Sequence, residues 1–171
     1  RIEPGQPDQP LTDPGFPAYQ FDVIQDLGWR IDLSRPPAFS PDGRATGSSR
    51  IRDLAWRGRP VHDDDPFVLA TNSYRLAACG LFAPLTACKP LALPPGPQTR
   101  DVIRNYLRQR RRVSIDPVPS WQFAPLPGTS ALFETGPRGL PLLEDIARSC
   151  DRRMEHVGRS AGDFALVRIH L

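Results

Sequence analysis

The chain has 171 residues, of which 39% are hydrophobic, 8% aromatic and 24% charged. These fractions are typical of a folded domain with its own core and exclude a fully disordered chain. The 22 basic and 19 acidic residues leave a net charge of +3, too small for a polyelectrolyte-type nucleic-acid binder. No apolar run reaches the ~18 residues of a transmembrane helix, and no signal-peptide pattern opens the chain.

Proline and cysteine set further limits. The 21 prolines and 13 glycines predict many turns and long ordered loops, and they exclude a bundle of long helices. The three cysteines, Cys79, Cys88 and Cys150, are too few for a disulfide framework and lack zinc-site spacing. A Cys79–Cys88 bridge is compatible with an oxidising compartment, and the sequence leaves it open.

The first third of the chain predicts a loop and then short strands. Prolines at five positions between 1 and 18 leave no room for a regular element there. Residues 21–24 form a strand candidate, and 29–33 alternate apolar and polar as a half-buried strand does. Residues 26–28 between them suit the turn of a hairpin.

The middle of the chain mixes strand and loop signals. Residues 51–56 alternate less cleanly, and 57–60 read as a turn. The apolar run 67–70 predicts a buried strand. A loop of small residues over 76–82 and a proline-rich loop over 84–97 follow.

The last part predicts two helices. One begins at Thr99 as N-cap, with Asp101 favourable to the helix dipole, and ends near Arg112. A short strand over 121–123 precedes a second helix over 140–154, and 164–171 alternate as a final strand. The expected fold class is therefore α/β with mixed α and β: a mixed or antiparallel sheet flanked by these helices, with proline-rich loops.

Three groups of polar residues are candidate sites, but each has a simpler interpretation. The arginines of 108–112 fit a solvated helix end better than a phosphate site. His62 and the three aspartates after it fit a solvated turn better than a metal cluster. His156 and His170 lack partners at ligand spacing, and no motif of a named catalytic class occurs.

The segment 70–82 is the more informative candidate. A predicted strand runs there into small residues and carries Tyr74, Arg75 and Phe82. Small residues let a ligand approach the backbone closely, and a tyrosine at a strand end is well placed to stack on a flat ring. For Phe82, packing into a core is the preferred interpretation, whereas for Tyr74 core packing and stacking on a ligand fit the residues equally well.

Five short stretches of the chain form a recognisable series. They are FPAYQFDVI at 16–24, WRIDLSRP at 29–36, FVLATNSYR at 67–75, DVI at 101–103 and WQFAP at 121–125. In this order they resemble the C-terminal domain of the 5′-nucleotidase family. The resemblance covers roughly residues 16–125 and is closest to the bacterial bifunctional 2′,3′-cyclic-nucleotide 2′-phosphodiesterase/3′-nucleotidases.

The resemblance implies a partial C-terminal, substrate-specificity domain over 1–125, completed by a helix and strand over 126–171. In that family two aromatic rings sandwich the nucleobase, and one of them falls on Tyr74. The implied substrate-binding residues are Asn72, Tyr74, Arg75, Gly80 and Phe82, with Phe82 or Tyr19 as a hypothetical second wall.

The resemblance places catalysis outside this chain. The implied parent is a periplasmic, metal-dependent hydrolase of cyclic 2′,3′-nucleotides and 3′-nucleotides. Its N-terminal metallophosphoesterase domain would hold two divalent metal ions, whereas this fragment would hold no cofactor, no metal ligand and no catalytic residue. Its expected partners are a nucleotide or nucleoside and that N-terminal domain, not a membrane.

One departure from the family keeps alternatives open. The family has a glycine-rich stretch after its Tyr-Arg pair, whereas this chain has Ala-Ala-Cys-Gly at 77–80. The added Cβ atoms restrict the backbone beside the base site. A stand-alone interaction module with a degenerate nucleotide site is therefore the alternative, and a nucleic-acid binder using the arginines of 108–112 ranks last.

Overall fold

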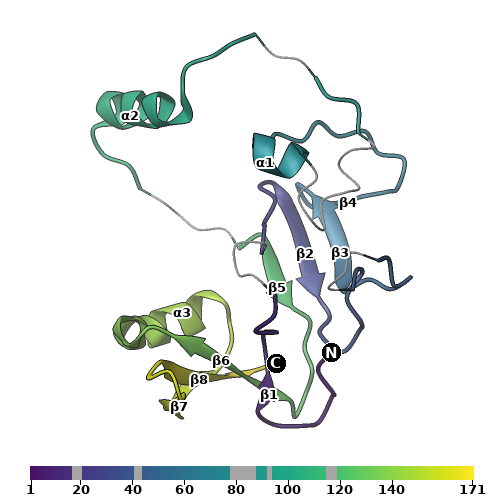
Figure 1. Ribbon diagram of the computed structural model, residues 1–171, viewed down its shortest axis with the longest axis vertical. Helices are drawn as coiled ribbons and strands as arrows, with labels where there is room; N and C mark the ends of the chain where they lie inside the picture. The colour runs from purple at the N-terminus through teal and green to yellow at the C-terminus, as the bar shows by residue number, and fades with distance from the viewer. Residues whose placement is uncertain (17–20, 41–43, 78–87, 92–93, 115–118) are drawn as a thin grey trace. The chain divides into compact units, whose positions relative to one another are not determined.

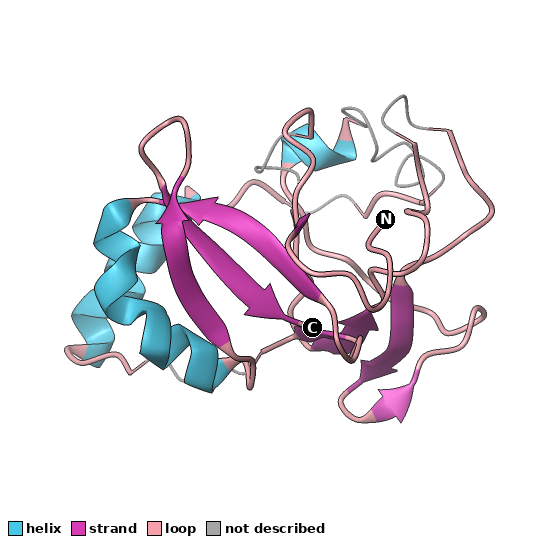
Figure 2. Cartoon of the chain, turned by 90° about the horizontal axis from the view of Figure 1, so that it is seen from below, coloured by secondary structure: helices cyan, strands magenta, loops and turns pink. Residues whose placement is uncertain are grey.

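The computed structural model describes residues 1–16, 21–40, 44–77, 88–91, 94–114 and 119–171. Its fold is mixed α/β, as predicted, with two four-stranded mixed sheets and three short α-helices (Figures 1 and 2). The chain divides into two compact units. The first comprises residues 1–66 and 119–171, and the second comprises residues 67–118.

One sheet of the first unit is built mainly from the last third of the chain. Its strand order is β1 (Gln9–Pro10), β6 (Ser130–Thr135), β8 (Ala165–His170) and β7 (Met154–Arg159). The pair β1–β6 is parallel, and β6–β8 and β8–β7 are antiparallel. A 3₁₀ helix, η3 (Pro137–Leu142), leads into α3 (Leu143–Ser149), which lies against β7.

The other sheet of the first unit has the order β4 (Arg59–Pro60), β3 (Ile51–Trp56), β2 (Leu27–Ile31) and β5 (Trp121–Phe123). The strand β2 runs antiparallel to β3 and parallel to β5. Arg57 and Gly58, both at positive φ, form the two-residue turn from β3 into β4. A glycine suits that turn because it adopts positive φ without a steric cost.

The alternation predicted for the final strand is confirmed. Ala165, Val167 and Ile169 are almost fully buried, whereas Leu166, Arg168 and His170 between them are only partly covered. Alternate residues of a strand point to opposite faces, so β8 presents one apolar face to the core. The buried core cluster consists of Ile2, Leu33, Ala131, Ile169 and Leu171.

The prediction that residues 1–18 form a loop with no regular element is wrong. Residues 9 and 10 form β1, and Ile2 is 4% exposed within the core cluster. The Ile2 amide donates to the carbonyl of Leu33 at 2.9 Å, and the Leu11 amide donates to that of Leu132 at 2.9 Å. Pro10 is tolerated because β1 is an edge strand, where a missing N–H faces no neighbour.

Two apolar runs predicted as strands are exposed loops. Phe21 and Val23 are more than half exposed, as are Phe67 and Val68, and neither 21–24 nor 67–70 has a strand partner in the pairings described. An apolar run provides the side chains that a strand buries. A strand also needs a neighbouring strand whose backbone forms hydrogen bonds with its own N–H and C=O groups. The predicted hairpin turn over 26–28 is also wrong, because Leu27 and Gly28 already belong to β2.

One helix prediction is confirmed over nearly its whole length, and the other is confirmed only in its N-terminal part. α2 (Thr99–Arg110) matches the predicted helix, although Gln98 rather than Thr99 is the N-cap. The predicted helix over 140–154 is shorter: α3 ends at Ser149, Asp151 adopts positive φ, and Met154 opens β7. Cys150 and Met154 are four positions apart. This spacing places both side chains on one face of either a helix or a strand, so it does not distinguish the two elements. The strands β6 and β7 were not among the elements predicted from the sequence.

In the part of the chain that the structure describes, no helix has both the length and the apolar character needed to cross a membrane.

Burial of Ile2 gives a direct test of the N-terminal segment's place in the core. We expect Ile2→Ala to lower the free energy of unfolding by about 2–5 kcal/mol, because it leaves a cavity beside Leu33 and Ile169. The matched control is Ile24→Ala, since Ile24 is 42% exposed, and we expect a change of about 0.5 kcal/mol or less. Urea denaturation followed by tryptophan fluorescence measures both, and equal losses would contradict the assignment.

Candidate functional site

The sequence-predicted site residues that the structure describes lie on α1 (Ser73–Leu76) in the second unit. Asn72 is the N-cap of this helix, and Tyr74 and Arg75 lie within it. The prediction that Tyr74 leaves a strand end is therefore wrong, since 67–70 is a loop and a helical turn follows. Gly80, Phe82 and Tyr19 lie outside the described residues.

Asn72 shapes the site through its capping bond. Its Oδ1 accepts a hydrogen bond from the backbone amide of Arg75 at 2.8 Å, and its carbonyl accepts from Leu76 at 3.1 Å. Asparagine is among the best N-cap residues because its side chain satisfies an otherwise unpaired amide of the first turn. The geometry therefore gives Asn72 a positioning role that the sequence analysis did not foresee.

Tyr74 and Arg75 form a cation–π pair. The Arg75 guanidinium carbon lies 5.3 Å from the centroid of the Tyr74 ring, within the range of an attractive contact. Tyr74 is 50% exposed, whereas Arg75 is only 9% exposed. An aromatic ring has two faces, so the guanidinium on one face leaves the other for a second flat group. The arrangement can stack a planar ligand, but it holds no nucleophile or proton-transfer pair.

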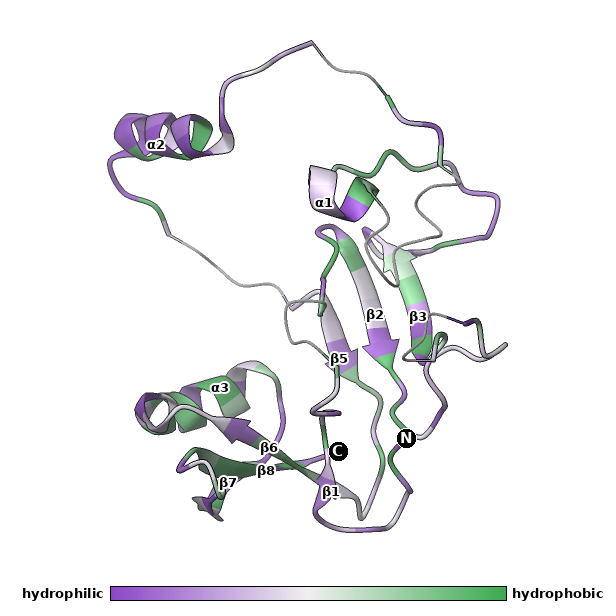
Figure 3. Ribbon diagram, viewed as in Figure 1, coloured by the Kyte–Doolittle hydropathy of each residue, from purple (hydrophilic) through white to green (hydrophobic). Residues whose placement is uncertain are grey.

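The arginine run of 108–112 begins on the exposed last turn of α2, which interleaves hydrophobic and hydrophilic residues (Figure 3). Arg104 pairs with Asp101 at 2.9 Å, and the Arg110 guanidinium lies 5.5 Å from the Tyr106 ring centroid. A pocket of about 530 Å³ along this helix is lined by Arg100, Ile103, Arg104, Leu107 and Arg108. Of the predicted base-binding residues that the structure describes, Asn72, Tyr74 and Arg75, none is among these lining residues.

The acidic stretch after His62 forms a turn, as predicted. The His62 amide donates to Asp65 Oδ2 at 2.9 Å, and the Asp65 amide donates back to the carbonyl of His62 at 3.1 Å. Among all residues whose placement is described, no group of three or more His, Cys, Asp or Glu side chains could hold a metal ion. Cys88 and Cys150 are free thiols, and Cys79 lies outside the described residues.

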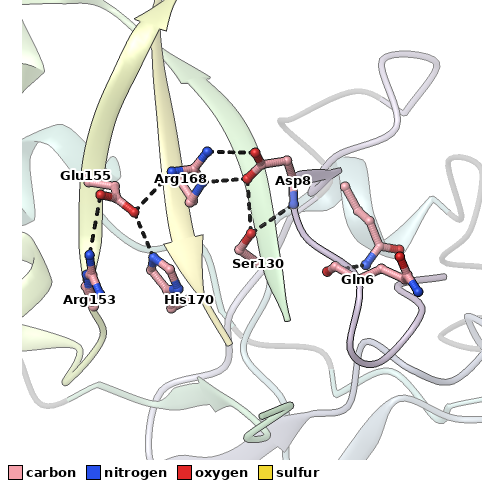
Figure 4. Close-up of polar contacts among 8 residues, drawn as sticks. Gln6, Asp8, Ser130, Arg153, Glu155, Arg168 and His170 are labelled. Atoms are coloured by element: carbon pink, nitrogen blue, oxygen red, sulfur yellow. Dashed lines mark hydrogen bonds and ion pairs between the residues drawn. The ribbon is translucent and has the colours of Figure 1, made fainter. Parts of the chain in front are cut away.

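A polar cluster in the first unit has no counterpart among the motifs visible in the sequence (Figure 4). Arg168 on β8 donates from Nε and Nη2 to both carboxylate oxygens of Asp8, at 2.5 and 2.6 Å. Its Nη1 donates to Glu155 Oε1 at 3.2 Å. Ser130 accepts from the Asp8 amide at 2.8 Å and donates to the Asp8 carboxylate at 3.1 Å. Partners up to 160 positions apart leave no local sequence signal.

His170 and Arg153 complete this cluster around Glu155. His170 Nε2 lies 2.9 Å from Glu155 Oε1, and Arg153 Nη2 lies 3.6 Å from Glu155 Oε2. The sequence analysis favoured a structural or surface role for His170, and this contact agrees with it. His156 also lies at the surface, with Nε2 2.7 Å from the carbonyl of Gly158.

The electrostatics of the cluster favour a structural role. Hydrogen bonding from Arg168 lowers the pKa of Asp8, and the bonds from His170 and then Arg168 lower the pKa of Glu155. The same bonds to Asp8 and Glu155 raise the pKa of Arg168. A carboxylate with a lowered pKa is a poor general acid and a weak base near neutral pH. The cluster therefore fastens the N-terminal segment to the sheet and has no catalytic arrangement.

Comparison with curated proteins identifies the class of protein to which this chain is related. Over 92% of its length it is 30% identical to the 2′,3′-cyclic-nucleotide 2′-phosphodiesterase/3′-nucleotidase of Haemophilus influenzae, of which it covers 25%. It is 31% identical over 80% of its length to the protein of the same name from Salmonella typhimurium, covering 22% of that protein. The trifunctional nucleotide phosphoesterase protein YfkN of Bacillus subtilis is 29% identical over 91% of this chain, which covers 10% of YfkN.

The chain is thus homologous, over most of its length, to the C-terminal portion of bacterial nucleotide phosphoesterases. It spans about a quarter or less of the length of each of these three relatives. No protein-family model matches the chain, and no solved structure matches it.

The lowered pKa values of Asp8 and Glu155 predict a stability that depends on pH. The folded carboxyls bind protons less tightly than the unfolded ones, whose pKa is about 4. Their contribution is therefore present above about pH 4 and is lost as the pH falls through the folded pKa values. We expect Asp8→Asn to lower the melting temperature at neutral pH, and the gap from wild type to narrow at lower pH.

Thermal melts followed by circular dichroism across pH 7 to 3 measure this gap. The control is Asp145→Asn, because Asp145 forms an exposed pair with Arg148 at 3.4 Å, and such pairs contribute little. A gap between wild type and Asp8→Asn that is the same at every pH would show that the charge of Asp8 does not matter.

Proposed function

We propose that this chain is the part of a nucleotide phosphoesterase that holds the nucleobase, with the ring of Tyr74 stacked against the base. The observation that carries the proposal is the exposed Tyr74 ring in a chain homologous, over nine-tenths of its length, to nucleotide phosphodiesterases and nucleotidases. The alignment length argues against a short chance match. The half-exposed ring supplies a surface on which any base can stack.

The parent enzyme we propose is a metal-dependent 2′,3′-cyclic-nucleotide 2′-phosphodiesterase/3′-nucleotidase. Its divalent metals would lie in an N-terminal metallophosphoesterase domain, which is the expected partner of this chain. The described residues bring no three metal-ligating side chains together, so they do not fit such a centre. We assign the described residues substrate holding and no step of the hydrolysis. By the same resemblance, we propose a periplasmic location.

The expected affinity of this chain alone is low. One base–aromatic stack contributes about 1–3 kcal/mol, whereas a millimolar dissociation constant corresponds to about 4 kcal/mol. A single ring therefore predicts millimolar binding or weaker. In the proposed parent, a second aromatic wall and phosphate contacts at the metal centre would supply the remaining affinity.

Tyr74→Ala is the direct test of this proposal. We expect 3′-AMP to bind the 171-residue chain weakly but saturably, and Tyr74→Ala to weaken that binding roughly 5- to 150-fold, because the stack is lost. A two-dimensional NMR titration measures millimolar affinities and shows which residues respond.

The chain offers a closely matched control. Tyr106 is 47% exposed and also has an arginine guanidinium on its ring, that of Arg110 at 5.5 Å, but it lies on α2. Tyr106→Ala should leave the affinity for 3′-AMP unchanged. Equal losses in both variants would mean nonspecific stacking on any exposed tyrosine. Binding that is insensitive to Tyr74→Ala would favour the alternative of a stand-alone interaction module.

A further inference from the structure

We infer that Arg75 positions the Tyr74 ring and makes this site discriminate against positively charged nucleobases. The inference rests on the proposed function, since it concerns how the base is held. It changes the role expected for Arg75 from the sequence, where Arg75 counts among the residues that contact the substrate. In this inference Arg75 contacts the Tyr74 ring, and the base contacts the ring but not Arg75.

The local geometry fixes which face of the ring a base can use. The Arg75 guanidinium lies 5.3 Å from the centroid of the Tyr74 ring and covers one of its faces. The Arg75 backbone is held by the Asn72 cap at 2.8 Å, so the helical turn defines where the side chain starts. A stacked base must then lie on the face of the ring opposite the guanidinium.

Burial separates Arg75 from a direct phosphate contact. Arg75 is 9% exposed, whereas the adjacent Tyr74 ring is 50% exposed. A side chain that binds a phosphate arriving from solvent needs its guanidinium edge accessible, as bidentate anion contacts require. The accessible part of the pair is the ring, and the covered part is the cation.

The charge of Arg75 determines which bases the ring favours. A positively charged base normally stacks on tyrosine at least as well as a neutral base, because the ring face attracts cations. In this site the Arg75 guanidinium already lies against one face of the ring. A base stacked ~3.5 Å from the opposite face would lie roughly 9 Å from the charge of Arg75. Like charges at that separation repel enough to change affinity about two- to twenty-fold at low salt.

The test compares adenosine with 1-methyladenosine, which has a similar shape but is positively charged near neutral pH. We expect the wild-type chain to bind adenosine several-fold more tightly at low ionic strength. The ratio of the two dissociation constants should fall toward one in Arg75→Met, which keeps much of the bulk but removes the charge. Arg75→Lys should keep the wild-type ratio, and Arg110→Met, which alters the similar pair on α2, should not change it.

The salt dependence of the wild-type chain provides a measurement that needs no variant, in case Arg75→Met does not fold. Charge repulsion across about 9 Å is screened at a Debye length of ~8 Å, so the ratio should shrink as salt rises to physiological strength. A purely structural role for Arg75 would change both affinities equally and leave the ratio unaltered by salt.

The outcomes distinguish this inference from the proposed function. A ratio that is the same in wild type and Arg75→Met, with binding still lost in Tyr74→Ala, overturns the role of Arg75 alone. Adenosine binding that survives Tyr74→Ala, or a wild-type chain that binds neither nucleoside, overturns both. A ratio that falls in Arg75→Met and with salt, but not in Arg110→Met, supports the inference.

Discussion

The bidentate contact between Arg168 and Asp8 holds together segments that are far apart in the sequence. It joins β8 to the residues just before β1, and it aligns β1 beside β6 so that Ile2 enters the core. Glu155 on β7 contacts the same guanidinium. One side chain thus links the N-terminal segment, the central strand and the edge strand of this sheet. A planar fork of donors suits this role better than the single ammonium group of lysine.

The candidate site also depends on a side-chain hydrogen bond, but one that joins residues close together in the sequence. One side-chain hydrogen bond, from the Arg75 amide to Asn72, begins the four-residue helix α1. That helix places an exposed ring and a covered cation next to each other, so in the proposed site Arg75 would act on a base only through the Tyr74 ring. Each cluster contains an arginine, but Arg168 fastens distant segments together, whereas Arg75 lies beside a half-exposed aromatic ring.

The sequence alone predicts the candidate site and the class of related proteins. The motif over 67–75 predicts Tyr74 and its neighbours as site residues, and this stays a prediction. The relation to bacterial nucleotide phosphoesterases is confirmed by alignments over most of the chain. Periodicity correctly predicted β8 and α2, because each buries or groups its apolar residues at a spacing that only one kind of element allows. It failed at 21–24 and 67–70, where apolar residues without a strand partner remain in exposed loops.

The sequence by itself determined the class of fold, the family relationship and the residue types available to the site. Only the tertiary structure decided that Ile2 is core, that His170 contacts Glu155 and that Arg168 pairs with Asp8. The reason is physical: periodicity and capping act over a few residues and are visible in the sequence. Burial and ion pairing depend instead on which distant segments meet, and positions up to 160 residues apart carry no local pattern that announces their contact.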